Sequence, residues 1–522
     1  MKTTRYWITV WLAAFALMPV SGQLASERTA GRLLDQAAFG PWTWNLLDVQ
    51  RVGIESWILW QQSITYSDIP DQPILLANGN VNLDLQPVTR AFYFNASYMP
   101  DQLRQRAAFA LSKIWVVSAA STRPAYAYPP YWRIMRDNAF GNYRDLIRAV
   151  TLSPAMGNFL NMANNNKANP RTGALPNENY ARELLQLFTL GLVQLNMNGT
   201  PVLDANGKPL PTFDQSAITE LSRALTGWTY PNTPGRNPSA NNPQYYFGQM
   251  IPFIGNHDTA AKAIFGGVQI PANQTPEQDL ESVLNALMAQ RTMAPFISKQ
   301  LIQQLVTSNP SPAYIERIAN VFWDNGQGVR GDLKAVIRAI LLDPEARAGD
   351  DPNFSMDPNF GRMREPVLFM VNMIRGLGGV ILDNSTINTR AAQMGQDLFN
   401  APSVFSYFSP NYRTEKGLLG PEFQIYNTQT ASNRANIVNA ILYGTLDRGT
   451  VFSTDPAGLV GKANVSLEAM MDGLNYVFFY RSMPQSLYNA AYTAAAAQTG
   501  SLNRVRAALY VALTSGEYQI IR

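Results

Sequence analysis

Cysteine is absent from this chain of 522 residues, and histidine occurs once, at His257. Without cysteine the chain forms no disulfides, has no thiol nucleophile and lacks the start of a lipid-anchored lipoprotein. A single histidine cannot build a multi-histidine zinc site, and no serine stands out as the partner of His257 in a catalytic triad. Haem, nucleotide and zinc signatures are missing as well, including a Walker loop and a Rossmann glycine pattern. Carboxylates, cations and His257 remain as candidates for chemistry.

Charge is also scarce and nearly balanced. Only 15% of the residues are charged, and the formal net charge is +4, with no dense basic stripe interleaved with aromatics. We therefore expect no nucleic-acid partner. With 46% hydrophobic residues, the chain is able to bury a large core and is not disordered.

Long apolar runs are confined to the first residues. Two basic residues precede the apolar run 7–20, and the small residue Gly22 suits cleavage directly after it. This pattern predicts a signal peptide over 1–22 and export to the periplasm, the outer surface or the medium, the alternative being a retained anchor. No later stretch approaches the length of a membrane span, so we expect no stable transmembrane segment.

Helical periodicity dominates the remainder and predicts one large all-α domain over 23–522. Two segments, 109–156 and 296–346, share one order of features: an apolar helix, a loop with Pro-Ala-Tyr, a second helix, a glycine and a third helix that ends at a proline. The segment 474–518 is a candidate third copy. The sequence therefore predicts duplicated three-helix units.

The segment between the first two copies, 157–291, has no counterpart elsewhere and is called the insert below. It contains Asp204-Ala205-Asn206-Gly207 between short apolar runs, which is the pattern of a small β-hairpin. Asp214 suits the N-cap of a helix that runs to Gly227. Because repeated units are expected to serve mainly as scaffold, we expect the ligand or partner site to lie in the insert.

One predicted helix of the insert, 177–191, is marked at both ends, by Asn177 as a cap and by Gly191 as a terminator. Glu178 and Arg182 have the i,i+4 spacing of an ion pair. Glu183 falls at the margin of the apolar face, where a carboxylate needs a partner or has a raised pKa.

Two interpretations of Glu183 are open. One is a buried ion pair with Arg223 or Lys262 that fixes helix packing. The other is a catalytic or metal-binding carboxylate. Glu178 and Glu183 point to different faces of the helix, which argues against a glycosidase pair made by these two alone.

His257 and Asp258 begin a predicted short helix that ends at Gly266, with Asp258 capping it and pairing with Lys262. The functional interpretation is that His257 acts as an acid/base group or as one ligand of an oxygen-rich metal site. Asn- and Asp-containing loops suit a divalent cation such as calcium, but no regular Asp-x-Asp-x-Asp-Gly loop is present, so no metal ligands are assigned.

Trp228 follows the predicted end of the helix that contains Arg223. It lies just before a loop rich in proline and asparagine. Its indole is either a wall on which a ligand stacks or a member of the core.

The sequence from Pro176 to Gly191 reads Pro-Asn-Glu-Asn-Tyr-Ala-Arg-Glu-Leu-Leu-Gln-Leu-Phe-Thr-Leu-Gly. Together with a few shorter motifs it resembles the bacterial family catalogued as domain of unknown function 1800, from about residue 33 to the C-terminus. The shorter motifs are Arg223 to Trp228, His257-Asp258 followed by Lys262 and Gly266, Arg364-Glu365-Pro366, and Met394-Gly395-Gln396 leading into Ala401-Pro402-Ser403-Val404. The resemblance implies a secreted, mainly helical protein without an established reaction. It also implies a partner, the sulfatase-like secreted family catalogued as domain of unknown function 1501.

These observations favour a binding or assembly role in the cell envelope or outside the cell, with a glycan or peptide as the ligand. The alternative is a hydrolase of an extracellular polymer. Its catalytic residues would be Glu183, His257 and Asp258, and its ligand-binding residues would be Glu178, Arg182, Arg223, Trp228 and Lys262. Geometry separates the two, since an enzyme requires the catalytic groups to converge in an open cleft.

Overall fold

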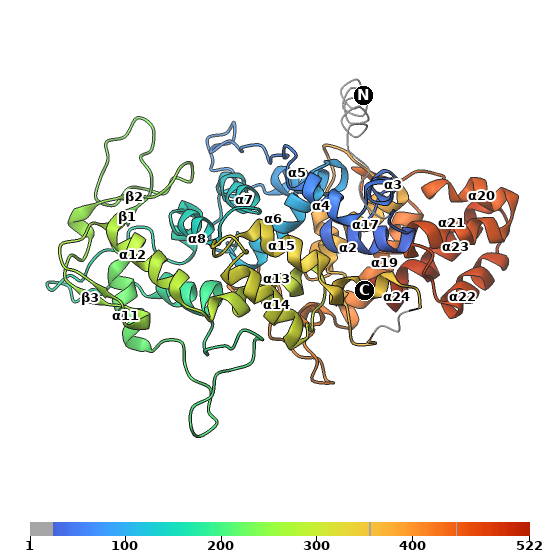
Figure 1. Cartoon of the computed structure of the whole chain (residues 1–522). Helices are drawn as coiled ribbons and strands as arrows, with labels where there is room; N and C mark the ends of the chain where they lie inside the picture. Colours follow the sequence, from blue (N-terminus) through green and yellow to red (C-terminus); the bar gives the residue numbers. More distant parts are fainter. Residues whose placement is uncertain (1–23, 354–356, 445) are drawn as a thin grey trace.

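The computed structural model describes residues 24–353, 357–444 and 446–522, and it confirms the mainly helical fold. These residues contain 23 α-helices, whereas their β-structure is limited to two-stranded ribbons and isolated bridges. The body is elongated, with the insert at one end and the last helices of the chain at the other (Figure 1). The predicted signal peptide lies outside the described residues. Among the residues described, no helix is both long and apolar enough to cross a membrane.

Helix α2 (Glu27–Ala37) ties distant parts of the chain together. Nε of Arg32 lies 2.8 Å from Oδ1 of Asp350. Asp35 accepts a hydrogen bond of 2.7 Å from Arg364 and one of 3.0 Å from the hydroxyl of Tyr480. The helices that follow it are α3 (Thr43–Val52), α4 (Ile54–Gln61) and α5 (Gln86–Tyr98).

The two segments compared in the sequence contain the same order of helices. In the first these are α6 (Gln102–Ile114), α7 (Tyr128–Asp137), α8 (Tyr143–Thr151) and α9 (Pro154–Phe159). In the second they are α13 (Met293–Leu305), α14 (Pro312–Trp323), α15 (Leu333–Leu342) and α16 (Pro344–Arg347). The segments meet at corresponding residues: the N–H of Tyr143 donates to the carbonyl of Gly331 at 2.7 Å, and the N–H of Leu333 donates to that of Gly141 at 3.0 Å. That the segments are copies of one unit stays a prediction.

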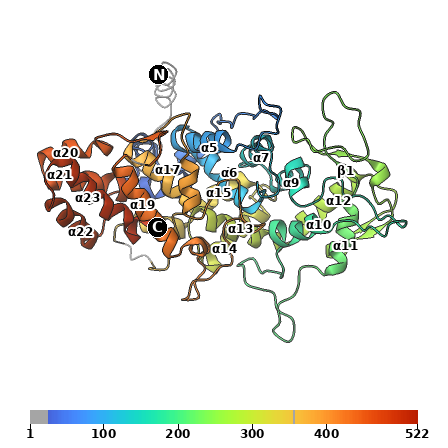
Figure 2. The same cartoon turned by 180° about the vertical axis from the view of Figure 1, so that it is seen from behind.

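The insert combines helices with two short ribbons. Its main elements are α10 (Asn179–Glu183), the π-helical turn η2 (Leu184–Thr189), α11 (Gln215–Ala224), α12 (Pro276–Ala289), β1 (Trp228–Thr229) paired with β2 (Ile251–Pro252), and β3 (Lys262–Ala263) paired with β4 (Gln269–Ile270). Seen from behind, α10, α11 and α12 lie together at this end (Figure 2). Asp214 caps α11 as predicted, because its side chain accepts from the N–H of Ala217 at 2.9 Å.

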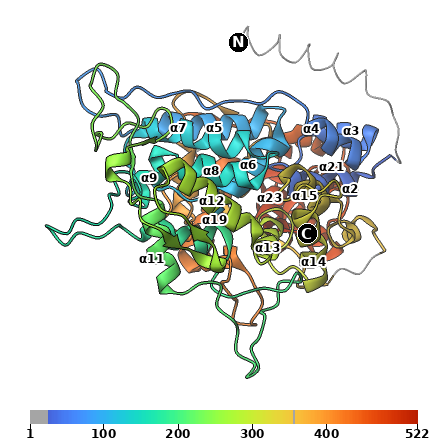
Figure 3. The same cartoon turned by 60° about the vertical axis from the view of Figure 1, so that its left-hand side comes forward.

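The predicted hairpin is present between η2 and α11. The N–H of Asp204 donates to the carbonyl of Lys208, and its side chain accepts from the N–H of Asn206, each at 2.8 Å. Isolated bridges pair Leu203 with Pro209 and Val193 with Pro211. The hairpin projects from the helical body, as Figure 3 shows at the bottom of the view.

The rest of the chain returns to the middle and then forms the far end. Its elements are β5 (Arg362–Met363), α17 (Pro366–Leu377), β6 (Val380–Ile381), α18 (Ile387–Gln393), α19 (Thr428–Leu442), β7 (Thr450–Val451), α20 (Leu459–Val465), α21 (Leu467–Phe479), α22 (Gln485–Ala496), α23 (Ser501–Thr514), α24 (Gly516–Gln519) and β8 (Ile520–Ile521). β5 pairs with β8, which fixes the C-terminus against the middle of the molecule.

Candidate functional site

His257 is sealed in the interior of the insert. Its Nε2 lies 3.1 Å from Oδ2 of Asp279, an acid in the first turn of α12. Nζ of Lys262 lies 2.8 Å from the same oxygen. All three side chains have an exposed fraction of 0%. This group, called the buried triad below, is therefore closed to a substrate.

Both ring nitrogens of His257 face oxygen acceptors. Nδ1 lies 2.8 Å from the carbonyl oxygen of Thr226, and Nε2 faces Asp279. The backbone approaches closely here: Gly227 has φ +83°, and a Cβ on it would lie 2.8 Å from Cβ of His257. The ring is thus held by packing and by hydrogen bonds on both sides.

Asp258 belongs to a second ion-pair group, which is only partly buried. Nε of Arg223 lies 2.8 Å from Oδ2 of Asp258, and Nη1 of Arg223 lies 2.7 Å from Oε2 of Glu220. Burial would raise the pKa of Asp258, but its hydrogen bonds and the Arg223 charge lower it. The hydrogen bond to Asp258 in turn raises the pKa of Arg223. The Asp258 carboxylate therefore stays ionised and paired with Arg223.

The local structure around His257 differs from the prediction. Residues 257–266 form no α-helix: Lys262 lies in β3, a 3-10 turn begins at Phe265, and the Asp258 side chain accepts from the N–H of Ala260 at 3.0 Å. The predicted helical pair of Asp258 and Lys262 is wrong. Its spacing presumes a helix, and the ribbon instead turns Lys262 inward onto α12.

The predicted helix 177–191 is split into α10 and η2. In η2 the N–H of Leu190 donates to the carbonyl of Leu185, a spacing of five residues. The start is shifted by one residue: Asn177 accepts from the N–H of Asn179 at 2.9 Å, but the N-cap position of α10 is Glu178, whose side chain makes no capping hydrogen bond. Such π-helical turns are frequent at functional sites.

Glu178 and Arg182 form the predicted pair, with Nη2 of Arg182 lying 3.0 Å from Oε2 of Glu178. Glu178 also accepts from Thr219 at 2.7 Å and from Gln215 at 2.8 Å, both on α11. The hydrogen bond from Thr219 is the main cause that lowers the pKa of Glu178. This pair therefore joins α10 to α11.

Glu183 is in a different situation. Its Oε2 is buried without a hydrogen-bond partner among the described residues, and burial raises its pKa. The predicted ion pair with Arg223 or Lys262 is wrong, because those cations engage Asp258, Glu220 and Asp279. The structure thus gathers His257 and the predicted charged residues into three ion-pair groups and leaves Glu183 outside all of them.

Replacing Glu183 with glutamine is expected to raise the melting temperature slightly at neutral pH. Because burial raises the pKa of Glu183, its ionised form costs stability above its ordinary pKa of 4.5. The side chain is only half-buried, so the gain is below about 1 kcal/mol. Thermal melts at pH 8 and pH 4 check this: the gain should be larger at pH 8. Glu178→Gln is the matched control and should lower the melting temperature, and the reverse order of the two variants would contradict the assignment.

Trp228 is a core residue. It lies in β1, opposite Pro252 of β2, and its exposed fraction is 3%. An open stacking wall is therefore not formed by its ring in this structure. Among the residues described, no group of three histidine or carboxylate side chains is placed to hold a metal ion.

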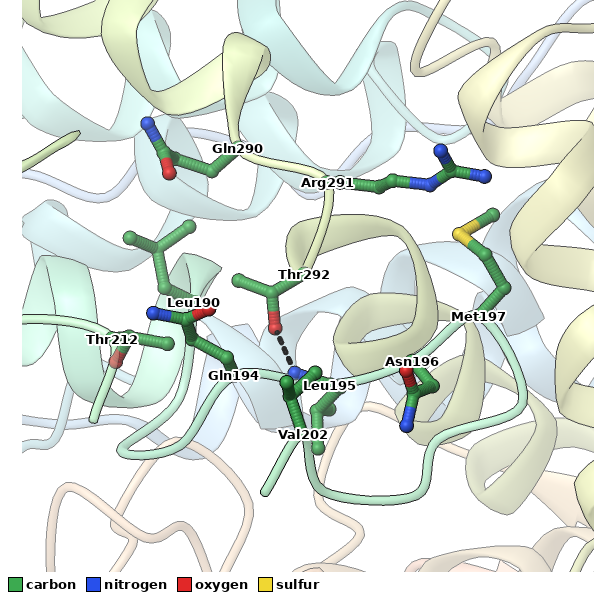
Figure 4. Close-up of a pocket in the computed structure, with 10 residues that line it drawn as sticks. All are labelled: Leu190, Gln194, Leu195, Asn196, Met197, Val202, Thr212, Gln290, Arg291 and Thr292. Carbon is green, nitrogen blue, oxygen red and sulfur yellow. Dashed lines mark hydrogen bonds between the residues drawn. The ribbon is translucent and has the colours of Figure 1, made fainter. Parts of the chain in front are cut away.

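An open pocket of about 500 Å³ lies at the root of the hairpin, within the size range of small-ligand sites. One wall is the chain from η2 into the hairpin, and the other is the connection between α12 and α13 (Figure 4). Its lining residues are Leu190, Gln194, Leu195, Asn196, Met197, Val202, Thr212, Gln290, Arg291 and Thr292. Sequence reasoning missed them, because uncharged polar residues at a hairpin root carry no motif.

Backbone contacts hold the two walls of the pocket together. The N–H of Leu195 donates to the hydroxyl of Thr292 at 2.9 Å. Gly191, where η2 ends, has φ +76°, and a Cβ on it would lie 2.8 Å from the ring of Phe296 in α13. The hairpin root is thus packed directly onto the start of α13, so the pocket walls are anchored on helices.

Sequence reasoning also missed a group of charges in the core between α6 and β5. Oε1 of Glu365 accepts from Lys113 and, at 2.8 Å, from Arg362, and its Oε2 accepts from Gln396 at 2.6 Å. The side chains of Lys113, Arg362 and Glu365 are buried. Burial alone would raise the pKa of Glu365, but Lys113, Arg362 and Arg106 together lower it to about 2. The family motifs that contain Glu365 and Gln396 pointed to these two residues, although the motifs did not reveal that Glu365 pairs with Lys113 and Arg362.

Comparison with protein families gives a match to the family described as "Protein of unknown function (DUF1800)", over residues 32–520. Comparisons with curated proteins and with solved structures give no match. The matched region covers nearly the whole chain and includes the insert, with α10 and η2, and the buried charges around Glu365. The chain belongs to the DUF1800 family.

Proposed function

We propose that this chain is a binding or assembly protein of the cell envelope or the extracellular space, and that it is not a hydrolase. The observation that supports this is that the ionisable residues predicted for catalysis lie apart from the open pocket of the insert. His257 and Lys262 both contact Oδ2 of Asp279 in the interior, and Asp258 is paired with Arg223. The open pocket is lined by amide, hydroxyl and aliphatic side chains and one arginine.

Hydrolysis by the carboxylate mechanism requires two acid or base groups that reach the same bond. The pocket lining contains no carboxylate and no histidine. Burial raises the pKa of Glu183, but its buried Oε2 has no hydrogen-bond partner among the described residues, so no second carboxylate or histidine is hydrogen-bonded to that oxygen. The same arrangement suits a binding site, in which polar groups orient a ligand without reacting with it.

The test combines a turnover assay with a binding assay on the purified chain without its leader. Incubation with extracellular glycans and peptides is expected to give no product above background. Mixing with a sulfatase-like secreted protein of the 1501 family is expected to give a complex on size-exclusion chromatography. Turnover that Glu183→Gln abolishes would overturn the proposal, and so would the absence of binding to both that protein and the polymers.

A further inference from the structure

We propose that the pocket at the hairpin root binds the carboxylate end of a peptide segment of a partner protein. This inference rests on the proposed binding function and names the chemistry of what is bound. It is carried by three properties of the lining: one cation without a carboxylate partner, an aliphatic wall, and amide side chains between them.

The cation is Arg291, the single charged residue of the lining. It is exposed, and among the residues described no carboxylate lies within ion-pair distance of it. Its guanidinium carbon lies 5.8 Å from the centre of the Trp323 ring, which leaves its N–H groups available. A guanidinium presents two parallel donors that match the two oxygens of a carboxylate. The charge of the pocket therefore selects an anionic group.

The walls favour a peptide over a saccharide. Four aliphatic side chains line the pocket, namely Leu190, Leu195, Met197 and Val202, and they suit an aliphatic residue of a peptide. The amide NH2 groups of Gln194, Asn196 and Gln290 donate within the chain, which leaves their oxygens as acceptors for peptide N–H groups. No aromatic ring belongs to the lining, so a sugar ring would find no flat surface on which to stack.

The arrangement gives the peptide a direction. Figure 4 shows Arg291 and Met197 at one end of the pocket and Leu190, Gln194 and Thr212 at the other. A terminal carboxylate at Arg291 would place the preceding residues toward Gln194. Beyond the pocket, Leu192 and Leu203 of the hairpin are 59% and 55% exposed, which offers apolar contact to the body of a partner protein.

The experiment uses an array of hexapeptides with free C-terminal carboxylates, probed with the labelled chain without its leader. The strongest binder is then measured by calorimetry as the free acid and as the C-terminal amide. We expect the acid to bind about tenfold more tightly or better, the effect of one charge-assisted hydrogen-bonded pair. Arg291→Gln should remove this difference. Arg236→Gln, an exposed arginine in the loop between β1 and β2, should leave it unchanged, and both variants should melt as the parent does.

Equal affinity for the acid and the amide would overturn the inference, as would an Arg291→Gln variant that keeps the difference. Binding of polyuronate but of no peptide would also overturn it. Failure here is distinguishable from failure of the proposed function. If Arg291→Gln still forms the complex with the sulfatase-like protein while the peptide result is negative, the chain binds its partner through another surface.

Discussion

Replacing Glu365 with glutamine is expected to lower the free energy of unfolding by about 3 to 5 kcal/mol at pH 7, the cost of breaking a buried ion pair. The carboxylate accepts from Lys113, Arg362 and Gln396. Glutamine offers one acceptor oxygen, and the NH2 group that replaces the other oxygen would face a donor of the neighbouring residues. Arg362 cannot lose its proton, whereas burial has already lowered the pKa of Lys113 to about 7. Urea unfolding followed by tryptophan fluorescence measures the loss.

The matched control for this variant is Glu415→Gln. Glu415 is an exposed residue in the segment before α19. Its substitution should change the unfolding free energy by less than about 0.5 kcal/mol. A Glu365→Gln variant as stable as the control would show that the charges around Glu365 contribute nothing to the fold.

The pH dependence of the unfolding free energy tests the role of Glu365 independently. The pKa of Glu365 is about 2 in the folded chain, against an ordinary value of 4.5. Between these values the unfolded chain binds a proton that the folded chain does not. The stabilisation is therefore complete above pH 4.5 and is lost as the pH falls toward 2. This group alone should cost the parent about 3 kcal/mol over that range, and the difference between parent and Glu365→Gln should narrow near pH 3. A constant difference would contradict the assigned pKa.

The fold was largely predictable, because its signals are local. Asp214 precedes an apolar helical pattern, and it caps α11. Asp204 to Gly207 is a turn sequence, and it forms a hairpin. The split of the predicted helix 177–191 into α10 and η2 was not predictable, since a π-helical turn has no periodicity of its own in so short a run.

The charged pairs were predictable only where they are local in sequence. Glu178 and Arg182 are four residues apart on a helix, and they form a pair. Glu365 and Lys113 are 252 residues apart, and no periodicity connects them. Asp279 looks like an ordinary first-turn acid of α12. One signal was available: it precedes Val283 by four residues, which places it on the apolar face of that helix.

Replacing Asp279 with asparagine is expected to destabilise the insert by about 3 to 5 kcal/mol, because it removes the carboxylate charge that pairs with buried Lys262. Lys262 would keep the carbonyl of Ala260 at 2.9 Å as an acceptor, but its charge would have no carboxylate partner in the interior. Hydrogen exchange is measured by mass spectrometry on the variant and the parent. Relative to the parent, the variant should exchange faster in α12 and β3, whereas α6 should change less. Glu277→Gln, at an exposed position two residues earlier in the same helix, should leave exchange unchanged.

The double variant Asp279→Asn with Lys262→Met separates buried charge from lost packing. Methionine keeps an unbranched side chain of similar length and removes the unpaired cation, so the double variant should recover part of the stability lost in Asp279→Asn. Lys262→Met alone should be less harmful than Asp279→Asn, because the Asp279 carboxylate then still accepts from His257. If the stability loss of the double variant equals the sum of the losses of the two single variants, the ion pair does not hold the insert together. In that case packing alone would hold the buried triad in place, and ion pairing would not be the reason that His257 is closed to a substrate.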